Sequence, residues 1–315
     1  MSLTRDLVLV LIPLPDRAKD ALEARYEAGA IPGATADEVI ERFGGAGVRA
    51  VITNGSVGLT QTQMHRLPEL KMVCAFGAGY ENIDIAAARL RGIEVTHAPG
   101  ANDATVADHA LGLMLAVARG FTVLDSAVRQ GDWHHARAER PTLNGAHLGI
   151  IGLGRIGAKI AARATAFDMH VSYLTRHPRA DVPWQHYTNI EQLARDSDFL
   201  VAACPGGTAT RHLVNARVLE ALGPNGVFIN ISRGSVVDTA ALIAALNAGG
   251  IAGAGLDVFE AEPDLPAALM ACPNTVFTPH IAGRSPAAIT AQTDMLLSSL
   301  AAYFEGGHSP FVVSA

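Results

Sequence analysis

The chain has 315 residues, carries a formal net charge of −6, and is 49% hydrophobic but only 5% aromatic. Its length exceeds that of a usual single domain, so we expect two domains. The acidic balance and the absence of a basic stripe argue against nucleic acid as the main partner. An apolar share built from Ala, Val, Leu and Ile favours helices packed on a buried parallel sheet over a β-sandwich.

The three cysteines, Cys74, Cys204 and Cys272, are widely spaced and form no Cys-x-x-Cys motif. They indicate neither a disulfide framework nor a zinc site, so we expect no metal and reduced thiols. The apolar run at 7–12 is too short for a signal core. No uninterrupted apolar stretch is long enough to span a membrane. We therefore expect a cytoplasmic protein without a membrane partner.

Short apolar runs alternate with longer amphipathic segments along nearly the whole chain. Strands are predicted at 7–12, 49–53, 71–75, 93–96, 147–151, 169–174, 198–202, 226–231, 252–256 and 275–278. Helices are predicted at 17–28, 103–119, 156–167, 190–195, 216–222, 239–248 and 287–304. This alternation predicts βαβ units, and hence an α/β protein with two doubly wound parallel-sheet domains.

A turn-rich stretch at 98–103 precedes the long predicted helix and indicates a domain boundary. After His280 the chain returns to helical spacing and could re-cross to the first domain. We therefore expect a discontinuous substrate domain at 1–100 and 287–315, with a dinucleotide-binding domain at 101–286.

Residues 152–157 read Gly-Leu-Gly-Arg-Ile-Gly and lie between a predicted strand and a predicted helix. In such a motif Gly152 permits the tight turn, Gly154 lets the backbone approach a pyrophosphate, and Gly157 lets helix and strand pack closely. The anion would bind the free N–H groups at the helix N-terminus. A lone motif of this kind can be an ordinary glycine-rich turn, but its position favours a dinucleotide site.

The strand after this loop ends without the acidic residue that usually accepts from the ribose 2′-OH of NAD. Leu174, Thr175 and Arg176 stand there instead, and Asp168 precedes the strand and should lie at its far end. Thr175 and Arg176 would favour a 2′-phosphate. NADP(H) is therefore favoured, with NAD(H) as the alternative, although Arg176 could also be a solvated loop residue.

Three stretches further along, at 228–238, 253–263 and 273–280, place polar residues after predicted parallel strands. The carboxyl ends of such strands form the edge where doubly wound sheets bind ligands. Alone, each candidate has an ordinary interpretation. His280 is one of 12 histidines, Glu262 could be a solvated acid before a proline, and Arg233 could be a turn residue.

At these stretches the sequence resembles the D-isomer-specific 2-hydroxyacid dehydrogenase family. The resemblance extends to 77–84, to 105–118 and to nearly all of 144–281. Residues 174–176 are most similar to NADPH-dependent glyoxylate/hydroxypyruvate reductases. The resemblance implies a Rossmann dinucleotide-binding domain, a flavodoxin-like substrate domain and a homodimer, for which the helix after residue 103 would make a natural surface.

The resemblance also implies roles for single residues. Arg233 matches the arginine that grips the substrate carboxylate and oxo oxygen, as a planar fork of donors can. His280 matches the general acid that protonates the carbonyl oxygen as the hydride arrives. Glu262 matches its carboxylate partner, which favours imidazolium. The amides of Ala78 and Gly79 would hold the substrate carboxylate.

A larger set is implied to contact the cofactor, with Asp257 orienting the nicotinamide carboxamide. The set comprises Thr105, Gly152, Gly154, Arg155, Ile156, Gly157, Thr175, Arg176, Cys204, Pro205, Thr210, Ile231, Arg233, Asp257 and His280. The sequence departs from many members at 283–286, Gly-Arg-Ser-Pro, where a cation or an altered hinge could change substrate preference.

The leading hypothesis is NADPH-dependent reduction of a small 2-oxo acid such as glyoxylate or hydroxypyruvate. One alternative is an NAD-dependent D-2-hydroxyacid dehydrogenase of the lactate type, which the missing acid near Leu174 disfavours. A second, from another class, is a cofactor-sensing protein resembling a corepressor. The sequence does not choose among the oxo acids.

Overall fold

The computed structural model describes residues 5–45, 47–134 and 136–313. The chain divides into two compact units, one comprising Met1–Asn102 and Arg284–Ala315 and the other Asp103–Gly283. The boundaries predicted from the sequence lie after residues 100 and 286. Each unit is an α/β fold built on one parallel sheet.

The first unit contains a five-stranded sheet in the order β2-β1-β3-β4-β5, with all pairs parallel. This is the strand order of flavodoxin-like folds. Its strands are β1 (Leu7–Val10), β2 (Glu27–Gly29), β3 (Ala50–Thr53), β4 (Met72–Ala75) and β5 (Glu94–Thr96). The central strand β3 is buried at all four residues, as its apolar run predicts.

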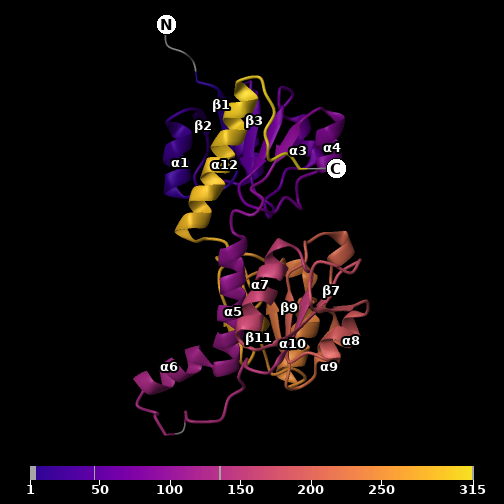
Figure 1. The fold of residues 1–315 in the computed structure, drawn as a ribbon. Helices are drawn as coiled ribbons and strands as arrows, with labels where there is room; N and C mark the ends of the chain where they lie inside the picture. The colour runs from indigo at the N-terminus through magenta and orange to yellow at the C-terminus, as the bar shows by residue number, and fades with distance from the viewer. Residues whose placement is uncertain (1–4, 46, 135, 314–315) are drawn as a thin grey trace. The chain divides into compact units, whose positions relative to one another are not determined.

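Helices cover both faces of this sheet. They are α1 (Asp16–Glu23), α2 (Ala36–Phe43), α3 (Gln61–His65), α4 (Ile85–Leu90) and α12 (Pro286–Phe304). Val39 and Ile40 pack on one face, and Leu296 and Leu300 pack on the other. The C-terminal helix α12 therefore belongs to the first unit, where it packs against α1 (Figure 1).

The departure at 283–286 has a local structural role at the start of α12. The Ser285 hydroxyl accepts from the Ala288 amide at 3.1 Å, and Pro286 occupies the first helical position. A serine cap followed by proline is a favourable way to begin a helix. This segment also contains the division between the two units.

The second unit contains a seven-stranded parallel sheet in the order β12-β11-β10-β9-β6-β7-β8. From β8 to β11 this is the order 3-2-1-4-5-6 of dinucleotide-binding folds, with β12 added at the edge. The strands are β6 (His147–Ile151), β7 (His170–Leu174), β8 (Gln185–Tyr187), β9 (Phe199–Ala202), β10 (Val227–Asn230), β11 (Gly253–Leu256) and β12 (Thr275–Phe277).

Two helices of this unit precede its first strand, and the others connect successive strands except β7 and β8. The helices are α5 (Asp103–Arg119), α6 (Phe121–Arg129), α7 (Arg155–Ala166), α8 (Ile190–Arg195), α9 (Ala216–Leu222), α10 (Thr239–Asn247) and α11 (Ala267–Met270), with short 3₁₀ turns η1 (Thr208–Thr210) and η2 (Gly234–Val236). Helix α6 projects from the body of the unit and has no buried residue (Figure 1).

The structure differs from the sequence-based expectation at several short elements. The helix predicted at 17–28 ends at Glu23, and the chain then forms the edge strand β2 beside Leu7. Strand β8 and helices α2, α3, α4, α6 and α11 are also additions. All of them have nine residues or fewer, too short for a full apolar period to stand out.

Among the described residues, no single helix is both long and apolar enough to cross a membrane, and only α5 and α6, bent by 55°, pass that criterion as a pair.

Candidate active site

The residues predicted in the second unit gather at one edge of its sheet. Because all seven strands are parallel, the loops that follow them leave from the same edge. Gly152, Thr175, Arg176, Cys204, Pro205, Ile231, Arg233, Asp257, Glu262 and His280 all lie in loops after strands of this sheet, and Thr210 lies in η1. Asp168 lies at the opposite edge, before β7, where Asn144 donates to its carboxylate at 3.0 Å. It is therefore remote from the loop that follows β7.

His280 and Glu262 form a direct pair. His280 Nδ1 lies 2.9 Å from Glu262 Oε2, and the other carboxylate oxygen accepts from the Phe259 amide at 2.9 Å. Burial alone would raise the pKa of Glu262, but hydrogen bonds from His280 and Phe259 and the positive charge of Arg233 hold that pKa below its ordinary value of 4.5. Because an ionised carboxylate only accepts, Nδ1 carries a proton and Nε2 is left for a ligand.

The backbone holds His280 in a conformation that few side chains adopt. Its φ is 52°, in the left-handed region, and its amide donates to the Asp257 carbonyl at 2.9 Å. Such strain persists only where the surrounding structure imposes it. Here the segment is fixed on both sides of His280, so the imidazole is presented in one direction.

Asp257 supplies much of that restraint. Its side chain is buried, and its Oδ1 accepts from the Thr278 hydroxyl at 2.6 Å and from the Ile281 amide at 2.9 Å. Its Oδ2 accepts from the Ala282 amide at 2.9 Å. The resemblance implies contact between Asp257 and the cofactor, a role that stays a prediction. The carboxylate in any case organises the segment that carries His280.

Sequence reasoning missed His109, on α5, as a member of this network. Its Nε2 lies 2.9 Å from Thr278 Oγ1 and 3.5 Å from Asp257 Oδ1. This contact joins two residues that are 169 positions apart in the sequence. No motif spacing connects such distant positions, so the sequence offered no signal for it.

The loop that carries Arg233 is built around a buried asparagine. Asn230 Oδ1 accepts from the Ser232 amide at 3.0 Å, and its Nδ2 donates to the Arg233 carbonyl at 2.9 Å. Arg233 Nη1 donates to the Ser232 carbonyl at 2.6 Å. The next residue, Gly234, meets the backbone of Phe259 and Glu260. The loops after β10 and β11 are therefore in direct contact, consistent with the charge of Arg233 acting on Glu262.

A second ion-pair cluster fixes the same loop from the other side. Glu260 Oε1 lies 2.8 Å from His212 Nε2, and its Oε2 accepts from the Thr239 hydroxyl at 2.6 Å. Burial would raise the pKa of Glu260, but the hydrogen bonds from Thr239 and His212 lower it. Glu260 thereby ties the stretch before Glu262 to the start of α10.

The glycine loop between β6 and α7 has the geometry that a pyrophosphate requires. Gly152 has a φ of 97°, and a Cβ at Gly157 would lie 2.1 Å from the Gly152 carbonyl oxygen. Helix α7 begins after Gly154 without a side-chain cap, so its first amides are not occupied by a capping side chain. Arg155 is tied to the buried Asp103 at 2.7 Å. These residues fit a dinucleotide at the helix N-terminus.

The loop after β7 is anchored on the glycine loop. Arg179 Nη1 donates to the Leu153 carbonyl at 2.9 Å, and the Arg179 amide donates to the buried Tyr173 hydroxyl at 2.8 Å. Thr175 Oγ1 donates to the His177 carbonyl at 2.6 Å, while Arg176 is exposed. The loop therefore has a defined shape, with Arg176 directed to solvent.

Cys204 lies beside the glycine loop. A Cβ at Gly152 would sit 2.8 Å from the Cys204 amide nitrogen, so the two backbones approach closely. Burial raises the pKa of the Cys204 thiol to about 11. The thiol is therefore protonated at neutral pH and is a packing group rather than a nucleophile.

The first unit places Ala78 and Gly79 after β4, at the carboxyl edge of the five-stranded sheet. The Ala98 amide donates to the Gly77 carbonyl at 2.8 Å, which ties this loop to the end of β5. Gly77 has a φ of 120°, a conformation that glycine adopts readily. The predicted carboxylate-binding loop is therefore an ordered turn.

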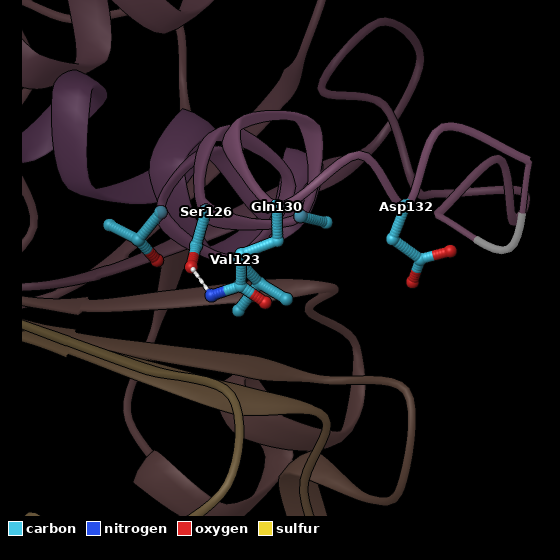
Figure 2. A pocket seen from close by; sticks show the side chains of 6 residues that line it. Val123, Ser126, Gln130 and Asp132 are labelled. Carbon is cyan, nitrogen blue, oxygen red and sulfur yellow. Dashed lines mark hydrogen bonds between the residues drawn. The ribbon is translucent and has the colours of Figure 1, made fainter.

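A surface depression of about 380 Å³ lies on α6 and the turn that follows it. Thr122, Val123, Ser126, Ala127, Gln130 and Asp132 line it (Figure 2). Gln130 Nε2 donates to Ser126 Oγ at 3.1 Å across one turn of the helix.

Within the described residues, no group of three or more His, Cys, Asp or Glu side chains is arranged to hold a metal ion.

Comparison with known proteins assigns the family. Residues 111–282 match the model of the D-isomer specific 2-hydroxyacid dehydrogenase NAD binding domain. The chain belongs to this family. It is therefore an oxidoreductase that acts on CH–OH donors.

Two curated relatives show how the family varies. The chain is 38% identical over 300 residues to a glyoxylate/hydroxypyruvate reductase A of Arabidopsis thaliana, covering 95% of this chain and 96% of that protein. It is 36% identical over 300 residues to a hydroxyphenylpyruvate reductase of Plectranthus scutellarioides, with the same coverages. These relatives have different oxo acids in their names.

A solved structure resembles this chain along nearly its whole length. It is an NADPH-dependent glyoxylate/hydroxypyruvate reductase from Sinorhizobium meliloti in complex with NADP and malonate, with a TM-score of 0.89 and 38% identity. The match covers 98% of this chain and 97% of that one. The expected α/β class with two parallel-sheet units is confirmed.

Proposed function

We propose that the chain reduces glyoxylate, hydroxypyruvate or a related small 2-oxo acid to the 2-hydroxy acid, with NADPH as the hydride donor. The observation that carries the proposal is the 2.9 Å contact between His280 Nδ1 and Glu262 Oε2 at the carboxyl edge of the sheet. In a 2-hydroxyacid dehydrogenase, such a pair supplies the proton that carbonyl reduction requires.

The proton would come from His280 Nε2. Glu262 occupies Nδ1 and fixes the ring orientation, so Nε2 is the nitrogen that faces the oxo oxygen, and the carboxylate stabilises the positive charge of the protonated ring. The lowered pKa of Glu262 keeps its carboxylate charged for this task. Bound NADPH would supply the hydride to the oxo carbon.

Arg233 would bind the substrate carboxylate and the oxo oxygen through its guanidinium. Charge-assisted and bidentate hydrogen bonds of this kind give geometric selectivity as well as affinity. The Asn230 and Ser232 contacts fix the loop on which Arg233 lies. In the first unit, the amides of Ala78 and Gly79 would donate to a substrate carboxylate, as the family resemblance implies.

The preference for NADPH would come from the loop after β7. Leu174 ends the strand where an acid would repel a 2′-phosphate, and Arg176 follows with its side chain exposed. The anchoring of this loop by Arg179 on the Leu153 carbonyl supports a fixed position for Thr175 and Arg176. We propose that Arg176 binds the 2′-phosphate, and that Thr175 joins it by turning its hydroxyl from the His177 carbonyl to the phosphate.

Initial rates of nicotinamide oxidation test the proposal. Glyoxylate, hydroxypyruvate, pyruvate and hydroxyphenylpyruvate are each compared with NADPH and with NADH. Higher kcat/KM with NADPH for at least one acid is expected. Higher kcat/KM with NADH would favour the NAD-dependent lactate-type alternative. Tight cofactor binding without turnover of any oxo acid would favour the sensing protein.

We also propose a homodimer, but through α6 and not through α5, the helix after residue 103 that the sequence favoured, because nine residues of α5 are buried within its own unit. Phe121 and Val128 are 52% and 50% exposed and, with Leu124 between them, form an apolar stripe on a helix with no buried residue. Val123 on the same helix and Trp133 just beyond its end are 59% and 58% exposed. Monomers rarely leave contiguous apolar surface of this kind in water, and a second copy is the occupant we propose.

Sedimentation equilibrium of the wild type and of Val128→Asp tests the dimer. The wild type should sediment as a dimer and the variant as a folded monomer, because a buried unpaired carboxylate opposes association. Gln192→Asp, at an exposed position of α8, is the matched control and should remain dimeric. A monomeric wild type would refute the proposal.

Cytoplasmic location stays a prediction, which cell fractionation can check.

A further inference from the structure

We propose that His97 is a positioning residue that aims the amides of Ala78 and Gly79 at the substrate carboxylate. This inference rests on the proposed function, since it takes those two amides as carboxylate donors. It concerns only the first unit. The residue itself is not among those that the sequence motifs indicate.

The contact that carries the inference joins the end of β5 to the loop after β4. His97 Nδ1 lies 3.0 Å from the Ala78 carbonyl oxygen. A carbonyl oxygen only accepts, so Nδ1 must carry the proton and donate it. The neighbouring Ala98 amide donates to the Gly77 carbonyl at 2.8 Å. Two consecutive carbonyl groups of the loop are therefore held by two consecutive residues after β5.

Holding these carbonyls also fixes the direction of the amides. In a trans peptide the C=O and the N–H that share one plane point in opposite directions. The Gly77 carbonyl shares its plane with the Ala78 amide, and the Ala78 carbonyl shares its plane with the Gly79 amide. Both N–H groups therefore face away from the end of β5, as an anion-binding pair requires.

The two amides have no backbone partner in the part of the chain that the structure describes, where neither Ala78 nor Gly79 donates to a carbonyl oxygen. Both residues are only partly buried, so a ligand has access to them. On its other side the loop meets Gly55, where a Cβ would lie 2.8 Å from the Gly79 carbonyl carbon. The turn is therefore held by the residues that follow β5 and by those that follow β3.

His97 is itself fixed, through both its backbone and its ring. Its amide donates to the Phe311 carbonyl at 3.2 Å, and Val312 forms an antiparallel bridge with Thr96. The imidazole meets the Tyr80 ring edge-on, with centroids 5.1 Å apart. The ring is therefore pre-oriented, and the Ala78 peptide has little freedom to rotate.

Three substitutions at His97 distinguish the effect of its hydrogen-bond donor from the effect of its aromatic ring. His97→Phe keeps an aromatic ring for Tyr80 but removes the donor. His97→Asn keeps a donor at the same bond distance from Cβ, because Asn Nδ2 and His Nδ1 are both attached to Cγ. His97→Gln places its donor one bond further out. His65→Phe, at an exposed position of α3, is the matched control for loss of a histidine.

Steady-state reduction of hydroxypyruvate with NADPH is the measurement. We expect His97→Phe to raise the KM for the oxo acid about tenfold, as loss of one charge-assisted hydrogen bond would. Its kcat and its KM for NADPH should change by less than about twofold, because the carboxylate contact stabilises ground and transition states alike. His97→Asn should restore the KM, whereas His97→Gln should resemble His97→Phe. His65→Phe should match the wild type.

The failures of the two proposals are distinguishable. If the wild type reduces no 2-oxo acid, the proposed function fails, and this inference fails with it. If the wild type is active but His97→Phe keeps its KM, or His97→Asn is as poor as His97→Phe, only the role of His97 is overturned. Should His97→Phe not fold, nitrogen NMR of the wild-type imidazole decides. The Nδ1–H tautomer is expected, and the Nε2–H tautomer would overturn the contact.

Discussion

Gly234 and Phe259 are packed so closely that a Cβ at Gly234 would lie 1.9 Å from the Phe259 carbonyl carbon. This approach joins the loop that carries Arg233 to the loop that carries Glu262. Glycine is required at this point because of space, since its φ is not in the left-handed region. The arrangement of the two charged side chains thus depends on a residue with no side chain.

Gly234→Ala should separate these loops. The methyl group has rigid backbone atoms as neighbours, so we expect a loss of stability of about 1–3 kcal/mol together with a marked fall in kcat. Urea unfolding and steady-state rates measure the two effects. Gly250→Ala is the matched control, because its Cβ would lie 3.4 Å or more from every neighbouring atom. Equal behaviour of the two variants would contradict the close approach.

Arg233→Ala should nearly abolish turnover of the 2-oxo acid while leaving NADPH affinity close to that of the wild type. Removing a preorganised donor to the reacting group costs roughly 10²–10³-fold in rate. Steady-state kinetics and titration of cofactor binding check the two parts. Arg217→Ala, on the exposed side of α9, controls for the loss of one cation. An unchanged rate in Arg233→Ala would remove its assignment as the carboxylate clamp.

Replacing Leu174 with Asp and Arg176 with Ala should move cofactor preference from NADPH towards NADH. The new carboxylate would repel the 2′-phosphate and accept from the ribose 2′-OH. Loss of the arginine removes a charge-assisted hydrogen bond, so the ratio of kcat/KM values should shift by roughly tenfold or more. Arg195→Ala is the control on an exposed helix of the same unit. If the ratio stays constant, the 2′-phosphate account of this loop is wrong.

Glu262→Gln should lower the rate of reduction by roughly 10²-fold at neutral pH, because the imidazolium loses its charged partner. In the wild type the pKa of Glu262 lies below 4.5, so its contribution persists above that pH and is lost as the pH falls through the lowered pKa. The ratio of wild-type to variant rates should therefore shrink as the pH falls through the lowered pKa of Glu262.

Rates measured across the acid range give this ratio directly. Glu260→Gln is the matched control, because Glu260 pairs with His212 rather than His280. It should keep the acid dependence of the wild type. A ratio that stays constant down to acid unfolding would show that the charge of Glu262 does not act in the reaction.

The main strands were predictable because buried parallel strands read as continuous apolar runs. Strands β2 and β8 were not, since Glu27–Gly29 and Gln185–Tyr187 are short edge strands with polar residues. Helix α1 was predicted too long for the same reason, because its expected last turn overlaps β2.

The site was predictable only in part. Glu262 and His280 were indicated by their positions just beyond the ends of predicted strands, yet their 2.9 Å contact depends on how two loops turn. His97 and His109 were missed because their partners lie 19 and 169 residues away. Such pairings cannot be read from neighbouring residues, whereas a glycine loop or a strand end can be recognised from a short consecutive stretch of sequence.

Deuterium transfer from labelled NADPH to hydroxypyruvate tests the central claim most directly. The protein is incubated with NADPH that carries deuterium at the transferable position, and the reduced acid is analysed by mass spectrometry. We predict one deuterium at C2 of the 2-hydroxy acid with the wild type and almost none with His280→Ala. Consumption of labelled NADPH without deuterium at C2, or no reduced acid at all, would contradict the account.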